Sequence, residues 1–237
     1  MDTKIALRKT SMVDYPGKVA AVFFFPGCNL RCPWCHNREL LEVSGSGEGL
    51  ITLEEAWRHI KKRRSVLRGV VLSGGEPTLY RELPSLIRSI KGLGLPVKLD
   101  TNGMAAAVLE DILKYRETRP DYIALDLKLA PPRYRALAAG PGLKDPGGEL
   151  EKSAALIRAS GTGREFRTLA FPRGFITEGD IRALAPLVDD SPWYFRPFRP
   201  GNCLDPAWDG FESPDAGETE VLVDTARSLG KNPVILR

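Results

Sequence analysis

The sequence predicts an α/β protein built on a parallel sheet. Short apolar runs rich in β-branched and aromatic residues alternate with segments that carry apolar residues at helical spacing. The 237 residues are 43% hydrophobic and 27% charged, which suits a protein that buries a sizeable core. Because repeated strand–helix units join parallel strands by right-handed crossovers, the pattern indicates an open doubly wound sheet or an incomplete (β/α) barrel.

The elements follow from that alternation. The expected strands are residues 18–25, 69–74, 95–100, 122–129, 164–171 and 193–198, with a short one in the tail at 232–237. The expected helices are residues 52–67, 81–93, 104–117, 147–160, 177–189 and 215–230. Thr52 and Glu55 form a capping box for the first helix, and Gly230 is a stop signal for the last. Segments 44–49 and 140–148 read as loops, and residues 1–237 are expected to form a single domain.

Composition and charge exclude several classes of protein. The formal net charge of +4 is too small to indicate nucleic-acid binding, and the basic run "KKRRSVLR" from Lys61 is interpreted as a solvated or docking face of a helix. The beginning of the sequence has no secretory signal, and the apolar run 19–25 is far shorter than the roughly 20 residues that span a bilayer. We therefore expect a cytoplasmic protein without a membrane partner, in which thiols stay reduced.

Polar and glycine-rich motifs follow several of the expected strands. They are "SGGEP" at 73–77, "DTNG" at 100–103, "DLK" at 126–128 and "RPFRPGN" from Arg196. Chemistry in parallel α/β folds gathers at the carboxyl ends of the strands, so this edge is the expected site. Side-chain alternation puts Asp126 and Lys128 on one face, as a buried ion pair or, as we favour, part of a site. Glycines in "SGGEP" permit close approach to the backbone, and Glu76 could accept hydrogen bonds from a ligand ammonium.

Three of the four cysteines lie in the loop that follows the first strand, at Cys28, Cys32 and Cys35. A structural zinc site needs four protein ligands, and His36 directly follows Cys35, where joint ligation is awkward. Cysteine thiolates also hold iron–sulfur clusters, and three of them leave one iron of a four-iron cluster open. Catalytic metal sites keep such an open position for substrate. Cys203 stands alone far along the chain and is interpreted as an idle thiol.

These motifs resemble those of the radical S-adenosylmethionine (SAM) enzymes. The spacing of the three cysteines, the aromatic Trp34 before the third, "SGGEP", "DTNG" and "DLK" carry the resemblance over nearly the whole chain. The segment "DYPGKVAAVFFFPGCNLRCPWCHN" is similar to the activating proteins of anaerobic ribonucleoside-triphosphate reductase and related glycyl-radical enzymes. The resemblance implies a partial (β/α)6 TIM-like barrel of parallel strands, of the radical SAM type.

The resemblance also implies roles for single residues. Cys28, Cys32 and Cys35 would ligate one 4Fe–4S cluster whose open iron binds the methionine part of SAM, and Trp34 would lie near the adenine. The residues implied to hold the SAM amino and carboxylate groups are Gly74, Gly75, Glu76, Asp100, Asp126 and Lys128. The reduced cluster would cleave SAM to a 5′-deoxyadenosyl radical, which takes a hydrogen atom from a glycine of the partner enzyme. A flavodoxin- or ferredoxin-like protein would supply the electron.

The sequence departs from some of these relatives, and two other functions stay open. No ferredoxin-like insertion follows the cysteine loop, so a single cluster is expected. The late histidine of pyruvate formate-lyase activators is missing, and Arg196 or Arg199 could replace it or be structural. One alternative function is a small-molecule enzyme similar to 7-carboxy-7-deazaguanine synthase. The other, a non-catalytic iron–sulfur electron carrier, is disfavoured by the open iron and by the polar strand ends.

Overall fold

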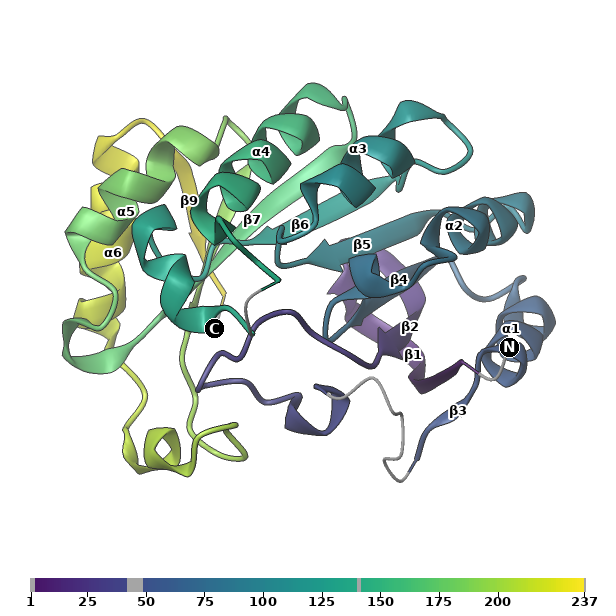
Figure 1. The fold of residues 1–237 in the computed structure, drawn as a ribbon, viewed down its shortest axis with the longest axis horizontal. Helices are drawn as coiled ribbons and strands as arrows, with labels where there is room; N and C mark the ends of the chain where they lie inside the picture. Colours follow the sequence, from purple (N-terminus) through teal and green to yellow (C-terminus); the bar gives the residue numbers. More distant parts are fainter. Residues whose placement is uncertain (1–2, 42–48, 140–141, 237) are drawn as a thin grey trace. The chain divides into compact units, whose positions relative to one another are not determined.

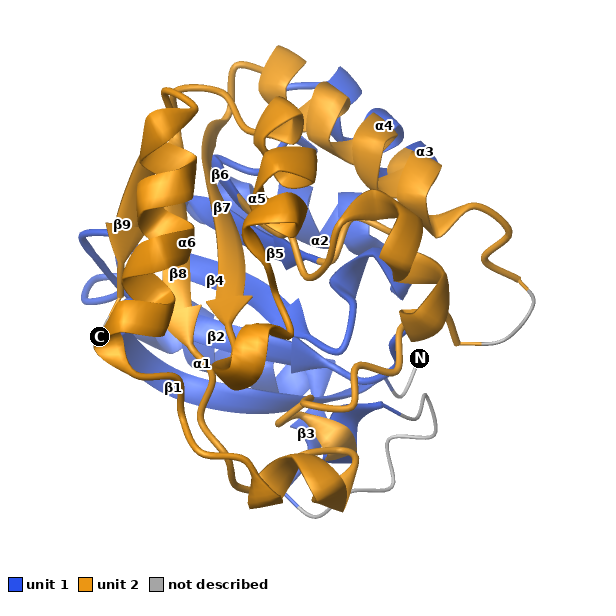
Figure 2. Cartoon of the chain, turned by 90° about the vertical axis from the view of Figure 1, so that its left-hand side faces the viewer, with its two compact units in different colours: residues 1–28, 39–101, 107–123 blue, residues 29–38, 102–106, 124–237 orange. Residues whose placement is uncertain are grey.

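Two units of structure divide the chain (Figure 2). The computed structural model describes residues 3–41, 49–139 and 142–236. The first unit comprises Met1–Cys28, Glu39–Thr101 and Ala107–Ile123, and the second comprises Asn29–Arg38, Asn102–Ala106 and Ala124–Arg237. Most of the expected loop at 44–49, and the start of the one at 140–148, lie outside the described residues. That residues 1–237 form a single domain stays a prediction.

The first unit contains a mixed sheet with helices (Figure 1). Its strands are β1 (Lys4–Tyr15), β2 (Lys18–Phe25), β3 (Ile51–Thr52), β4 (Gly69–Gly74) and β5 (Val97–Thr101). Its helices are α1 (Leu53–Arg63), α2 (Leu83–Gly92), most of α3 (Ala106–Lys114) and the 3-10 turn η2 (Pro77–Leu79), and η1 (Arg38–Leu40) begins at its boundary. Strand β2 pairs in parallel with β4, and β4 with β5, so their carboxyl ends share an edge.

The two strands that the sequence analysis missed are antiparallel. Strand β1 pairs with β2 on one side and with β3 on the other, so the expectation of parallel strands alone is wrong at this end. Register shifts on either side of Ser11 interrupt β1, so its buried residues do not alternate with exposed ones. The two-residue period that identifies a strand is therefore absent from its sequence.

The second unit continues the strand–helix alternation. Its strands are β6 (Tyr122–Asp126, whose first two residues belong to the first unit), β7 (Gly163–Ala170), β8 (Pro192–Pro197) and β9 (Asn232–Ile235). Its helices are α4 (Pro146–Ala159), α5 (Glu178–Leu184) and α6 (Ala216–Ser228), with 3-10 segments η3 (Pro131–Leu137), η4 (Pro172–Gly174), η5 (Ala185–Leu187) and η6 (Pro206–Gly210). Strands β7, β8 and β9 pair in parallel, as the alternation predicts.

Local signals place the helix ends where the sequence indicates. The capping box of Thr52 and Glu55 begins α1, and similar boxes begin α5 and α6. Gly230, with φ 71°, follows α6 as the expected stop. Strand residues such as Phe23, Leu72 and Leu125 are fully buried and form the core of their units. Within the described residues, no helix is long and apolar enough to cross a membrane.

Candidate functional site

The loop after β4 packs tightly on the backbone that follows β2. The Gly75 amide donates to the Phe25 carbonyl at 2.9 Å, and the Glu76 amide donates to the Gly27 carbonyl at 2.8 Å. A Cβ on Gly75 would lie 2.1 Å from the Gly27 oxygen, and one on Gly74 would lie 2.4 Å from the Phe25 nitrogen. The glycines therefore admit the protein's own backbone, whereas the sequence analysis assigned this freedom to a ligand. They fix the segment that leads into the cysteine loop.

Glu76 is buried and organises the same edge of the first unit. Its Oε1 accepts hydrogen bonds from the Thr78 amide at 3.1 Å and the Thr78 hydroxyl at 2.6 Å. The same oxygen accepts from the Thr101 hydroxyl at the end of β5, at 2.8 Å. Glu76 thus caps η2 and joins the ends of β4 and β5. Its predicted contact with a SAM amino group stays a prediction.

Asp100 lies in a charged pair that the sequence analysis did not identify. Its Oδ1 accepts from the Lys98 ammonium at 2.6 Å, and its Oδ2 accepts from the Ser73 hydroxyl at 3.1 Å. The Lys98 side chain is only 2% exposed. Lys98 and Asp100 are two residues apart on β5 and so share a face. That alternation is the signal in the sequence that could have identified Lys98.

Asp126 and Lys128, which side-chain alternation places on one face, form an ion pair at 2.9 Å. The favoured prediction, that they are part of a site, stays a prediction. Arg167 of β7 adds a second cation, with its Nε 2.7 Å from the other Asp126 oxygen. Burial opposes ionisation of Asp126, but the charges of Arg167 and Lys128 outweigh it and hold its pKa well below the usual range. Burial likewise opposes the Lys128 charge, but Asp126, followed by Cys32, raises its pKa above the usual value. Cys32 of the cysteine loop therefore lies close to this ion cluster.

The cysteine loop is anchored in the second unit at several points from 29 to 36. The Asn29 amide group donates to the Met104 carbonyl at 3.2 Å, and its Oδ1 accepts from the Asn102 side chain at 2.9 Å. Further along the loop, the Pro33 carbonyl accepts from the Asp205 amide at 2.9 Å. His36 Nε2 lies 2.9 Å from the Arg199 carbonyl oxygen. Loop residues between the cysteines and directly after Cys35 are thus held by segments far away in sequence.

Trp34 is buried in a cluster of aromatic rings. Its ring centroid lies 4.8 Å from Phe171, 5.1 Å from Trp208 and 5.4 Å from Phe175, in edge-on or tilted arrangements. Such pairs add to the hydrophobic gain from burial. Trp34 therefore anchors the loop between Cys32 and Cys35. A contact between Trp34 and adenine stays a prediction.

Cys203 is fully buried, and none of the four cysteines takes part in a disulfide. Burial, followed by a hydrogen bond to the Asp209 carboxylate, raises the pKa of the Cys203 thiol to about 11. Cys203 also lies near Cys35 of the loop, and it is a protonated thiol at neutral pH. This chemistry fits the interpretation of Cys203 as a thiol that is not a ligand. Arg196 and Arg199 are both exposed.

The predicted metal ligands fall on both sides of the division between the units. Cys28 ends a segment of the first unit, and Cys32 and Cys35 belong to the second. Among residues 3–41, 49–139 and 142–236, no three Cys, His, Asp or Glu side chains are gathered as a preformed metal site. Thiols in the predicted set match the ligand chemistry of an iron–sulfur cluster, so the residues fit such a group. Their joint ligation stays a prediction.

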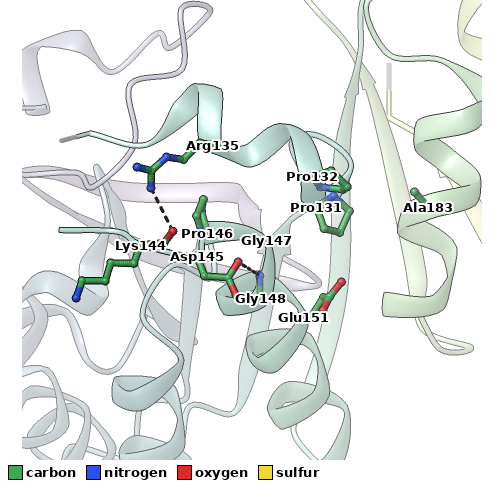
Figure 3. Close-up of a pocket in the computed structure, with 10 residues that line it drawn as sticks. All are labelled: Pro131, Pro132, Arg135, Lys144, Asp145, Pro146, Gly147, Gly148, Glu151 and Ala183. Carbon is green, nitrogen blue, oxygen red and sulfur yellow. Dashed lines mark hydrogen bonds between the residues drawn. The ribbon is translucent and has the colours of Figure 1, made fainter. Parts of the chain in front are cut away.

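A pocket of about 570 Å³ in the second unit is separate from these residues (Figure 3). It lies among η3, the first turn of α4 and α5, and its lining includes Pro131, Arg135, Asp145 and Glu151. None of the predicted site residues lines it.

Asn102→Asp should loosen the cysteine loop. A carboxylate cannot donate to the Asn29 Oδ1, so two acceptors would face each other in a buried place. We expect the free energy of unfolding to fall by about 1–3 kcal/mol in urea titrations. Asn202→Asp is the matched control, because Asn202 is exposed, and it should change stability little. Equal losses in both variants would contradict the account.

Asp126→Asn should reduce stability in a pH-dependent way. The folded protein lowers the pKa of Asp126, so its contribution is fully present above the unfolded value of about 3.9 and is lost as pH falls towards the folded pKa. The difference in unfolding free energy between wild type and variant should be about 2 kcal/mol at pH 7 and shrink below about pH 4. Asp190→Asn, at an exposed position, should show no such difference. A difference that persists unchanged at pH 3 would contradict the prediction.

Comparison with known proteins gives matches to radical SAM proteins over most of the chain. The sequence model of the radical SAM superfamily matches residues 22–146. The chain is 32% identical, over 95% of its length and 92% of the relative's, to a Methanocaldococcus jannaschii protein named "putative glycyl-radical enzyme activating enzyme". It is 33% identical to the pyruvate formate-lyase-activating enzyme of Clostridium pasteurianum, over 52% of this chain and 51% of that one.

Two further matches bear on the alternatives and on the fold. The 7-carboxy-7-deazaguanine synthase of Aquifex aeolicus is 36% identical over 38% of each chain. The crystal structure of a radical SAM methyltransferase from Sphaerobacter thermophilus superposes with a TM-score of 0.66, at 14% identity, over 94% of this chain and 67% of that one. The latter supports the predicted fold, a partial (β/α) barrel of the radical SAM type, with β1 and β3 as antiparallel additions.

Proposed function

This chain belongs to the radical SAM superfamily, and from that membership we propose that it generates a glycyl radical on a partner enzyme. Superfamily membership implies a 4Fe–4S cluster and SAM. One observation carries the proposal: a loop with three cysteines and no disulfide follows β2, tied at its start to the glycine-rich loop after β4. Similarity to an activating enzyme over nearly the full length of both chains supports the choice of partner.

Three groups of residues would bind the cluster and SAM. Cys28, Cys32 and Cys35 would hold a single cluster and leave one iron open for SAM. Gly74, Gly75 and Glu76 would hold the SAM amino group, Asp100, Asp126 and Lys128 would surround its carboxylate, and Trp34 would lie near its adenine. When bound, the reduced cluster supplies the electron that cleaves SAM to methionine and a 5′-deoxyadenosyl radical, which removes a hydrogen atom from the partner's glycine.

The chain's own residues would orient the substrate and exclude water. The ionised Asp126 lies between Lys128 and Arg167, and Arg167 is also 4.0 Å from the buried Glu165 carboxylate. The two cations would orient a carboxylate, and Asp126 and Glu165 balance their charge. Because the folded structure lowers the pKa of Asp126 and raises that of Lys128, both charges persist at neutral pH. The glycine contacts would keep Cys28 at the start of a fixed loop.

We further propose that the partner is anaerobic ribonucleoside-triphosphate reductase, that a flavodoxin or ferredoxin donates the electron, and that the protein works in the cytoplasm. The sequences "DYPGK" and "CPWCHN" support this choice of partner. Protein reconstituted anaerobically with iron and sulfide, then given SAM and dithionite, should release 5′-deoxyadenosine. Adding the reductase should produce the doublet of a glycyl radical in the electron paramagnetic resonance spectrum. An intact cluster without 5′-deoxyadenosine would instead indicate an electron carrier.

A small-molecule function is the second candidate, because part of the chain is 36% identical to a 7-carboxy-7-deazaguanine synthase. The two functions differ in their product. The second candidate replaces the first if three results coincide. 5′-Deoxyadenosine forms, no glycyl radical appears on the reductase, and the substrate of 7-carboxy-7-deazaguanine synthase is converted to 7-carboxy-7-deazaguanine.

A further inference from the structure

The 3-10 segment η3 (Pro131–Leu137) follows directly after Asp126 and Lys128 and contacts four other parts of the second unit. Three consecutive side chains, Arg133, Tyr134 and Arg135, bind three different partners. Its carboxyl end runs beside the cysteine loop. No motif in the sequence indicates a role for this segment. Its contacts indicate how the chain sets the position of the ion cluster relative to that loop.

The outer side of η3 is fixed to helices α4 and α5. The Arg133 guanidinium donates to the Asp180 carboxylate at 2.8 Å and to the Phe175 carbonyl at 3.0 Å. Arg135 donates to the Leu143 carbonyl at 2.7 Å and to the Lys144 carbonyl at 3.2 Å. The bond to Lys144 is drawn beside the pocket in Figure 3. A Cβ on Gly147 would lie 2.8 Å from the Pro131 oxygen, so α4 reaches η3 through a glycine. These contacts hold η3 in place from outside.

The inner side of η3 ends in the hydroxyl of Tyr134, which is fully buried. This hydroxyl accepts a hydrogen bond from the Lys128 amide at 2.7 Å and donates one to the Asp126 carbonyl at 3.1 Å. It therefore satisfies two backbone groups on either side of Leu127, just where β6 ends. Leu127 between them is bonded to Arg167 and Thr168, so the Tyr134 oxygen completes the hydrogen bonding of the backbone that carries Asp126 and Lys128.

The carboxyl end of η3 pairs with the cysteine loop. The Arg31 amide donates to the Leu137 carbonyl at 2.8 Å, and the Ala139 amide donates to the Asn29 carbonyl at 3.0 Å. Leu30 and Ala138 form the antiparallel bridge between these bonds. The pairing lies just before Cys32, which is close to Lys128. One short segment thus binds both the cysteine loop and the strand end that carries the ion cluster.

We propose that η3 is a brace between the cysteine loop and the ion cluster, and that Tyr134 is a positioning residue for SAM. The inference rests on the proposed function, because the brace matters only if both parts bind one ligand. Tyr134 would not touch SAM. Its hydroxyl would set the position of the Asp126 and Lys128 backbone, and η3 would carry that position to the loop before Cys32.

Tyr134→Phe tests the brace, because it removes one oxygen and leaves the ring in place. In reconstituted protein we expect wild-type iron content, SAM affinity about tenfold weaker, and a matching rise in KM with kcat changed far less. The electron paramagnetic resonance spectrum of the reduced cluster should differ from wild type only when SAM is present. Tyr115→Phe, at an exposed position of the first unit, is the control and should leave the iron content, SAM affinity, KM, kcat and spectrum unchanged.

A second measurement needs neither cluster nor SAM. In protein without the cluster, alkylation of Cys32, followed by mass spectrometry of its peptide, should be several-fold faster in Tyr134→Phe than in wild type, since Cys32 is 7% exposed. Arg133→Gln removes the contacts on the outer side of η3. Like Tyr134→Phe, it should weaken SAM affinity and speed the alkylation of Cys32. Wild-type SAM affinity in both variants, or loss of folding in both, overturns the proposal. If Cys32 is alkylated faster in the variants but the wild-type protein does not cleave SAM, the structural role of η3 is supported and the proposed function is rejected.

Discussion

Replacing Cys28, Cys32 or Cys35 with alanine is expected to abolish both the iron–sulfur cluster and the cleavage of SAM. Three thiolates are the fewest that hold a four-iron cluster with one open iron, so losing any one removes the site. Each variant should therefore bind far less than the roughly four irons of a complete cluster. Iron and sulfide per chain and 5′-deoxyadenosine formation after anaerobic reconstitution measure the two effects.

Cys203→Ala is the matched control for these three variants. Cys203 is a buried thiol that hydrogen-bonds the Asp209 carboxylate, and its pKa, raised to about 11, keeps it protonated at neutral pH in the protein without a cluster. The variant should retain the iron and the activity of wild type. If Cys203→Ala loses the cluster, or if one of the other three variants keeps it, the assignment of the ligands is wrong.

Gly75→Ala is expected to have the second large effect. Its Cβ would lie 2.1 Å from the Gly27 carbonyl oxygen and 3.2 Å from the Leu40 carbonyl oxygen. Both are backbone atoms, so neither can rotate away, and the segment before Cys28 has to shift. Overpacking of this kind costs about 1–3 kcal/mol. The shift should also lower the iron bound on reconstitution.

Gly92→Ala provides the comparison, since it makes the same change in the exposed last turn of α2. Nothing lies within 4 Å of its Cβ position, and alanine favours a helix over glycine by up to about 1 kcal/mol. Urea titrations should show a less stable Gly75 variant and an unchanged or more stable Gly92 variant. A Gly75 variant with wild-type stability and iron content would show that this close approach is not needed.

Strands β2 and β4 could be predicted because each is an almost continuous apolar run bounded by polar or glycine residues. The predicted bounds of β2 and β4 agree with the structure, and Asp126 and Lys128, predicted to share a face, lie in contact with each other. Side-chain alternation within a single strand carries that information. Strand β1 could not be predicted in the same way, because its register shifts around Ser11 remove the alternation.

Residues that act through distant contacts were missed for a different reason. Arg167 reaches Asp126 from a strand 41 residues later, and Thr101 binds Glu76 from 25 residues later. No local period encodes such pairs, since they depend on which strands become neighbours. Tyr134 was missed because a 3-10 segment has no signature in a sequence comparable to that of a helix. Trp34 was identified by its position before Cys35, but its packing among Phe171, Phe175 and Trp208 requires the fold.

The central claim is that Cys28, Cys32 and Cys35 hold a cluster whose open iron binds SAM. Electron–nuclear double resonance of the reduced cluster, with SAM labelled by ¹⁵N at its amino group and ¹³C at its carboxylate, tests it most directly. The account predicts hyperfine coupling from both labels to the cluster in the wild type and in Cys203→Ala. A reduced four-iron cluster that shows no coupling to either label, with SAM at saturating concentration, would contradict it.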